Sequence, residues 1–157
     1  MSTSVDVVDF EIGGTRYALD IVMAREIVEM VPLTPVPRAP EFIAGIINLR
    51  GEITNIINLN SLLQIPDQKA MAEKKIIVLV PEAAGGSNLG IIVDDVRSVL
   101  QVAEEDVEGM DESLCQEAYI KGIIREGAGE GGNTGSTGLI IWIDMAKMLQ
   151  NLAGAGA

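Results

Sequence analysis

The chain has 157 residues, with 11 basic and 23 acidic side chains, a net charge of −12 and 48% hydrophobic residues. This length is enough for one compact core or for two very small ones. The negative charge repels phosphate backbones and anionic lipid surfaces, so it argues against nucleic acid as a partner.

The first half of the chain has the pattern of short β-strands around a proline-rich loop. The alternating segment 5–12, the turn Gly13-Gly14 and the segment 16–21 predict an opening β-hairpin. Four prolines within residues 32–40 exclude a helix and a central strand, so an ordered loop or edge segment is expected there. Two more strands are then predicted, at 46–49 and 53–59.

The second half begins with a polar connector at residues 67–75 and continues with strands and one helix. The predicted strands lie at 76–80, 89–93, 96–102, 120–125 and 139–143. Asp144 suits the N-cap of a helix at 144–153, because apolar residues recur at helical spacing behind it: Met145, Met148, Leu149 and Leu152. The chain is therefore predicted to be all-β, with short helices that include one near the C-terminus.

A faint internal repeat relates the two halves. The segment YALDIVMAREIV at 17–28 lies without gaps over LGIIVDDVRSVL at 89–100, and FIAGII at 42–47 overlays YIKGII at 119–124. Chance matching among Ile and Val is the alternative explanation. Because closing a small sheet removes its exposed edges, the repeat favours two small meandering barrels, each made from about half of the chain.

The chain lacks the side chains most used in catalysis. It has no histidine, which is the usual base for a Ser or Cys nucleophile and a usual metal ligand. Asp94 and Asp95 are adjacent in a strand-like stretch, so they should point to opposite faces instead of converging on one substrate. Residues 127–132 match GxGxxG but precede a strand and open no helix, and the acidic residues around 104–112 lack the spacing of a calcium loop. We therefore predict no catalytic residue, no cofactor-binding residue and no metal site.

The predicted location is cytoplasmic. Cys115 is the only cysteine, which excludes an internal disulfide framework and fits a reducing compartment. No stretch is apolar enough to span a bilayer, and Met1–Ile12 lacks the basic start of a signal peptide. Barrels this small leave some apolar side chains exposed, which favours a protein that binds other proteins and has no direct membrane insertion.

Several segments resemble the CheW family of chemotaxis coupling proteins. They are YALDIVMAREIV, LTPVPRAPEFIAGIINLRGEI, IINLNSLL, GIIVDDVRSVLQV and the closing YIKGIIR with LIIWIDMAKML. The resemblance runs from about Asp6 to Leu152, and GxINLRG after the proline-rich loop is its most specific part. It implies a single CheW-like domain over residues 1–157 that contains two SH3-like five-stranded β-barrels packed side by side, at about 14–72 and 73–143.

The resemblance also implies a function without catalysis and without cofactors. The chain would be an adaptor at receptor arrays beneath the membrane. It would join the cytoplasmic signalling tip of a methyl-accepting chemoreceptor to the regulatory domain of the histidine kinase CheA, which shares this fold. Two alternatives stay open at this point: an adaptor of another receptor-kinase pathway, and a ligand-binding or enzymatic β-barrel that uses Asp94, Asp95 or the glycine-rich loop.

Candidate partner-binding residues follow from the match to the family's NLRG and EI segments. They are Glu26, Gly45, Asn48, Arg50 and Gly51. The glycines would allow a sharp turn and a close backbone approach. Arg50 could pair with Glu26 or Glu52, or present its donors to a receptor carboxylate. The alternative is a purely internal salt bridge that holds the first barrel together.

Four apolar residues are further candidates, for a groove between the barrels in which a receptor helix tip could lie: Ile27, Val28, Val99 and Leu100. The alternative for any one of these side chains, taken individually, is a place in the apolar core. The chain departs from the family pattern at Asn55, where proline is common, and in the long glycine-rich loop at 127–138. Contacts that relatives make through that loop therefore do not transfer.

Overall fold

The computed structural model describes residues 4–66, 70–81, 88–103, 107–108, 119–125 and 138–149. Its first half contains β1 (Ser4–Ile12), β2 (Thr15–Asp20), the 3-10 helix η1 (Ile21–Met23), β3 (Ala24–Glu29), β4 (Ile43–Leu49), β5 (Glu52–Asn58) and α1 (Leu59–Leu63). Its second half contains η2 (Met71–Glu73), β6 (Lys75–Leu79), β7 (Leu89–Val93), β8 (Asp95–Ala103), β9 (Val107–Glu108), β10 (Ile120–Arg125) and β11 (Leu139–Ile143). The predicted all-β class with few short helices is confirmed.

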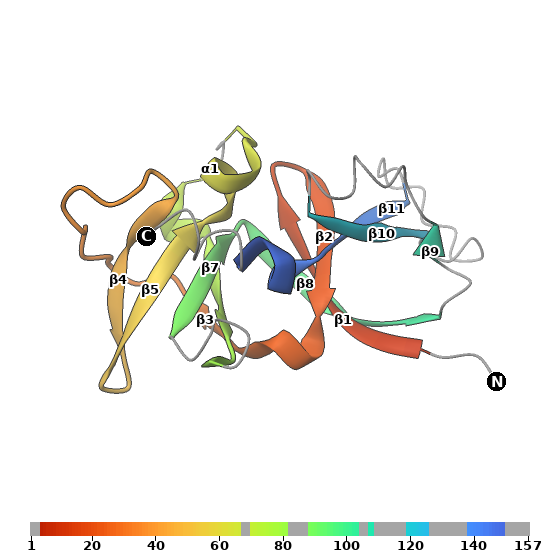
Figure 1. Cartoon of the computed structure of the whole chain (residues 1–157), viewed down its shortest axis with the longest axis horizontal. Coiled ribbons are helices and arrows are strands. Elements are labelled where there is room, and N and C mark those ends of the chain that lie inside the picture. The colour runs from red at the N-terminus through yellow and green to blue at the C-terminus, as the bar shows by residue number, and fades with distance from the viewer. Residues whose placement is uncertain are drawn as a thin grey trace.

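The strands form two small sheets that lie side by side (Figure 1). The six-stranded sheet has the order β8-β1-β2-β11-β10-β9, and the five-stranded sheet has the order β3-β6-β7-β5-β4. Each sheet therefore takes strands from both halves of the chain. The chain crosses between the sheets at η1 and again at Asp94, so a boundary between residues 72 and 73 does not separate the two sheets.

The internal repeat is visible in the register of the strands. The parallel pair β5/β7 aligns Asn55 with Leu89, and the parallel pair β2/β11 aligns Tyr17 with Ile141. The repeat alignment places residue 17 over 89, and Ile57-Asn58-Leu59 also matches Ile143-Asp144-Met145, which carries residue 55 over 141. The two pairs are therefore equivalent. The repeated unit is thus half of the chain, whereas each sheet is a mixture of the two copies.

Each sheet is closed by the chain that follows one of its edge strands. Beyond β3, the backbone N–H and C=O of Thr34 bond to those of Ile46 in β4, both at 2.9 Å. At the equivalent place beyond β8, β9 pairs with β10. A Cβ atom at Gly45 would lie 2.6 Å from the carbonyl oxygen of Thr34, so this close approach requires glycine. Closure leaves each sheet as a small barrel with few free edges.

A shared apolar core joins the two barrels. The largest cluster contains residues of the six-stranded sheet, such as Phe10 and Leu19, together with residues of the five-stranded sheet, such as Ile77 and Ile91. Two smaller clusters fill the barrels themselves, one around Val7 and Ile140 and the other around Ile56. Because the largest cluster lies between the sheets, the barrels are packed as one body.

Two short helices occupy equivalent places after β5 and β11. The predicted C-terminal helix is present at residues 145–149, and Asp144 Oδ1 accepts a hydrogen bond from the backbone N–H of Lys147 at 3.1 Å. In the first copy, the side chain of Asn58 accepts from the backbone N–H of Asn60 at 3.0 Å. The N-cap prediction is confirmed, while residues 150–153 of the predicted helix lie outside the described residues.

Candidate functional site

The tip of the β4–β5 hairpin is a two-residue turn made by Arg50 and Gly51. Leu49 pairs with Glu52 across it, and φ is +53° at Arg50 and +85° at Gly51. Positive φ at both central positions is the type I′ turn, which favours Asn or Gly at the first of them. For a residue with a Cβ atom, this left-handed region costs about 1–2 kcal/mol. Arg50 is therefore held in a conformation that its own propensity opposes.

Two ion pairs connect this hairpin to β3. Arg50 Nη1 lies 2.7 Å from Glu26 Oε1, and Arg25 Nη1 lies 3.5 Å from Glu52 Oε1. Arg50 thus pairs with Glu26, while Glu52 has Arg25 as its partner. The Arg50 side chain is still 68% exposed, and pairs at such exposure contribute about 0.2–1 kcal/mol. The pair orients the guanidinium more than it stabilises the barrel.

Asn48 and Gly45, both on the strand that leads to the turn, have different surroundings. Asn48 is exposed, and its Oδ1 accepts a hydrogen bond from the backbone N–H of Gly51 at 2.8 Å. Gly45 is buried against the segment at Thr34 and has no surface of its own to offer. Of the five candidates in the hairpin and in β3, Gly45 is the one that is buried.

The four apolar candidates divide into two kinds. Val28 packs against the core of the five-stranded barrel and Leu100 against the core of the six-stranded barrel. Ile27 on β3 is 44% exposed and Val99 on β8 is 54% exposed. Within the described parts of the chain, the four share no apolar cluster. The groove between the barrels stays a prediction, whereas Ile27 and Val99 are accessible.

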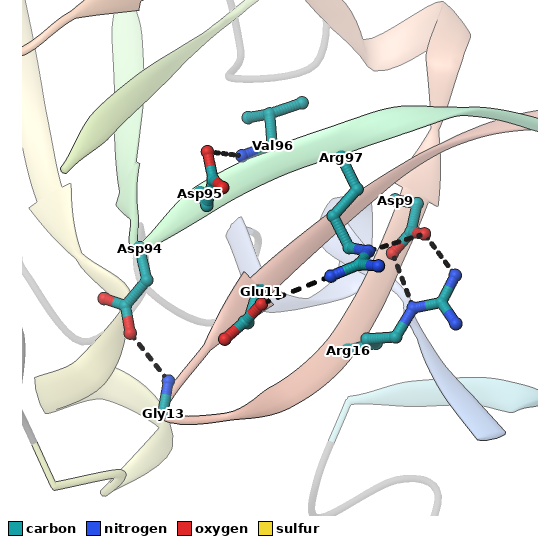
Figure 2. A network of polar contacts seen from close by, with 8 residues as sticks. All are labelled: Asp9, Glu11, Gly13, Arg16, Asp94, Asp95, Val96 and Arg97. Atoms are coloured by element: carbon teal, nitrogen blue, oxygen red, sulfur yellow. Dashed lines mark hydrogen bonds and ion pairs between the residues drawn. The ribbon is translucent and has the colours of Figure 1, made fainter. Parts of the chain in front are cut away.

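Asp94 and Asp95 point in different directions (Figure 2). Asp94 Oδ2 accepts a hydrogen bond from the backbone N–H of Gly13 at 2.8 Å, and Asp95 Oδ1 accepts from the backbone N–H of Val96 at 2.9 Å. The two carboxylates therefore do not converge on one substrate position. Their arrangement agrees with the prediction that they do not form an acid–base pair.

A buried lysine was not predicted from the sequence. The Lys74 side chain is 0% exposed; its Nζ lies 3.4 Å from Asp94 Oδ1 and donates a hydrogen bond to Asn60 Oδ1 at 3.2 Å. Lys75, its neighbour, begins β6 and pairs at the surface with Glu29. Two adjacent lysines in a polar stretch give no local signal of which one is buried, so only the fold distinguishes them.

A second buried carboxylate belongs to the six-stranded barrel. Asp9 is 0% exposed and pairs with Arg16, while Arg97 reaches both Asp9, at 3.9 Å, and Glu11, at 3.6 Å (Figure 2). Arg97 corresponds to Arg25 in the repeat, and each lies at the register shift of its strand. These contacts explain the arginines of β3 and β8 as parts of the barrel walls.

The described residues offer little to the enzymatic alternative. A cavity of about 460 Å³ beside α1 is lined by Glu41, Asn58, Asn60, Ser61, Gln64, Ile65 and Pro66, without Asp94 or Asp95. In the described ranges, no group of three or more metal-binding side chains comes together, and no helix is long and apolar enough to cross a membrane. Cys115 and most of the glycine-rich loop lie outside the described residues.

Comparisons with known proteins agree on one family. The family model described as CheW-like domain matches residues 6–153. The chain is 30% identical over 151 residues to Chemotaxis protein CheW of Treponema pallidum, covering 92% of this chain and 82% of that protein. It is 27% identical over 147 residues to Chemotaxis protein CheW of Thermotoga maritima, covering 94% and 89%. The crystal structure of scaffolding protein TtCheW from Thermoanaerobacter tengcongensis matches with a TM-score of 0.73 and 30% identity, over 90% of this chain and 84% of that one.

Proposed function

The chain belongs to the family of CheW-like domains, and we propose that this chemotaxis adaptor couples chemoreceptors to the histidine kinase CheA through the tip of its β4–β5 hairpin. The observation that carries the proposal is the conformation of Arg50. A type I′ turn formed for stability alone would have Asn or Gly at this position. Backbone strain of this kind is concentrated at functional sites, which supports a contact role for the guanidinium.

The geometry suits recognition of a carboxylate. A guanidinium has five N–H donors in a planar fork, and the Nη1 atom is the one that contacts Glu26. The 68% exposure of the side chain leaves the rest of the fork accessible to a partner. Glu26 is only 17% exposed, so it acts mainly as the orienting group. We assign Arg50 to an acidic side chain on the receptor signalling tip.

The proposed action is geometric and involves no catalysis. The receptor tip binds at the hairpin and β3, while the regulatory domain of CheA binds a different barrel surface. The shared core between the barrels keeps the two docking surfaces at a fixed separation. The adaptor would then lie at receptor arrays beneath the membrane, where both partners are found.

Reconstitution of the purified protein with receptor fragments and CheA tests this proposal. Arg50→Glu should reduce kinase activation by about tenfold or more, because a hydrogen bond to a charged group contributes about 1.5–3 kcal/mol. The matched control is Arg125→Glu on β10, since Arg125 is 67% exposed and pairs with Glu108. The control should couple as the parent does. Equal losses in both variants, or a parent protein that adds nothing to kinase association or activity, would contradict the proposal.

A further inference from the structure

The two halves of the chain hold each other together. The first half comprises β1 to α1, and the second comprises η2 to the C-terminal helix. Of the nine pairings between strands in the described residues, five lie within a half. The other four, β1/β8, β2/β11, β3/β6 and β5/β7, join the two halves. Neither sheet can therefore form from one half alone.

The buried polar contacts also cross between the halves. Lys74 of the second half donates to Asn60 of the first, and the backbone N–H of Gly13 in the first half donates to Asp94 in the second. The apolar cluster between the barrels contains residues of both halves as well. These contacts fix the alignment of one half on the other, because a shifted arrangement would leave buried charges without partners.

The covalent connection between the halves is short compared with the extent of the contacts between them. The backbone carbonyl of Pro66 accepts from Asn60 Nδ2 at 3.3 Å, and the carbonyl of Ala70 accepts from the backbone N–H of Glu73 at 2.9 Å, so both ends are tied to their own half. Three residues, 67–69, separate them in the sequence. Every contact between the halves would be the same if the two halves came from different copies of the chain.

We propose that two copies of this chain exchange halves, so that the first half of each packs against the second half of the other. The resulting dimer contains two complete copies of the fold, and it differs from the monomer in which copy of the fold each Pro66 is joined to through the chain. A short tether gives an effective concentration in the millimolar range, so the monomer is favoured in dilute solution. Exchange requires the halves to separate, so the dimer forms during refolding at high concentration or when the connector is too short.

The exchanged dimer would be a bivalent adaptor. Arg50 and Glu26 belong to the same half, so each copy of the fold keeps an intact hairpin site. This inference is independent of the partners proposed above, because it concerns only the contacts within the chain.

A disulfide placed across the halves distinguishes exchange from ordinary association. Asp6 and Gln101 are exposed cross-strand partners in β1 and β8 and belong to different halves. The variant Asp6→Cys, Gln101→Cys, Cys115→Ser is unfolded, refolded at about 5 μM or about 500 μM, oxidised and run on a denaturing gel without reductant. These two concentrations lie about a hundredfold apart, below and near the millimolar tether concentration. The control variant carries Asn48→Cys and Ile53→Cys instead, a cross-strand pair within the first half.

We expect a covalent dimer only for the 6/101 variant and only after refolding at the high concentration. The control should migrate as a monomer under both conditions, because its disulfide closes within one half in either arrangement. A second variant deletes residues 67–69, which leaves one Cα–Cα step of about 3.8 Å between Pro66 and Ala70. This deletion in the 6/101 variant should give the covalent dimer even at the low concentration. A 6/101 variant that stays monomeric on the gel under every condition, with and without the deletion, would overturn the proposal.

Discussion

Replacing Arg50 by Asn should separate function from stability. The substitution removes the guanidinium that we assign to the receptor, but it puts the residue preferred by a type I′ turn at a position where φ is +53°. Coupling and folding should therefore change in opposite directions. A substitution at a buried position would usually lower folding stability and coupling together.

The size of the stability change follows from two contributions. Loss of the exposed pair with Glu26 costs about 0.2–1 kcal/mol. Asn adopts the left-handed region readily, so the substitution regains most of the cost of about 1–2 kcal/mol that this backbone conformation has at Arg50. The net effect is a gain of about 0–1.5 kcal/mol in the free energy of unfolding, or a Tm higher by up to about 6 °C for a chain of this length.

Thermal melting followed by circular dichroism, together with the reconstituted kinase assay, measures both changes. We expect Arg50→Asn to melt at or above the temperature of the parent and to lose kinase activation by about tenfold or more, as estimated for a lost charged hydrogen bond. A lower Tm would show that the salt bridge holds the barrel together. Coupling equal to that of the parent would show that the guanidinium makes no contact with a partner.

Three further tests concern the fold. Gly45→Ala should destabilise the protein by about 2 kcal/mol or more, because the added Cβ atom would clash with the carbonyl oxygen of Thr34. Gly14→Ala meets open space and has only its positive φ to accommodate, so it should cost about 1 kcal/mol in the same melting assay. Equal losses would contradict the steric explanation. In denaturant unfolding, Lys74→Met should lower the free energy of unfolding by about 3–5 kcal/mol, because it leaves Asp94 buried without its cation. Lys75→Met should change it by under about 0.5 kcal/mol. A loss for Lys74→Met as small as that of Lys75→Met would mean that water reaches Asp94. Burial raises the pKa of Tyr17 above its ordinary value, so the folded protein keeps this proton longer than the unfolded chain, and stability should fall as the pH rises past about 10. Tyr17→Phe should flatten this alkaline loss, and an unchanged pH profile would refute the assignment.

Local patterns in the sequence predicted the elements better than their arrangement. Alternation around Gly13-Gly14 predicted the β1–β2 hairpin, and Asp144 before an apolar periodicity predicted the C-terminal helix, because turns and caps depend on neighbouring residues. The exchange of strands between the halves was not predicted, since pairing partners far apart in the sequence leave no local trace. The site showed the same division. The pairing of Arg50 with Glu26 was one of three options from sequence, beside Glu52 and a receptor carboxylate. The left-handed backbone of Arg50 depends on the hairpin register and was not predicted.

The crossings at η1 and Asp94 enclose the five-stranded barrel in one continuous segment, residues 24–93, whereas the six-stranded barrel is built from the two segments on either side. A truncation at the midpoint would still destroy both barrels at once, because each would lose at least one strand from its middle. Grafting the five-stranded barrel onto another protein would require one continuous piece of chain from β3 to β7, whereas the six-stranded barrel would require two pieces, one carrying β1 and β2 and the other carrying β8 to β11. The two repeated halves thus form a unit in which neither can be discarded.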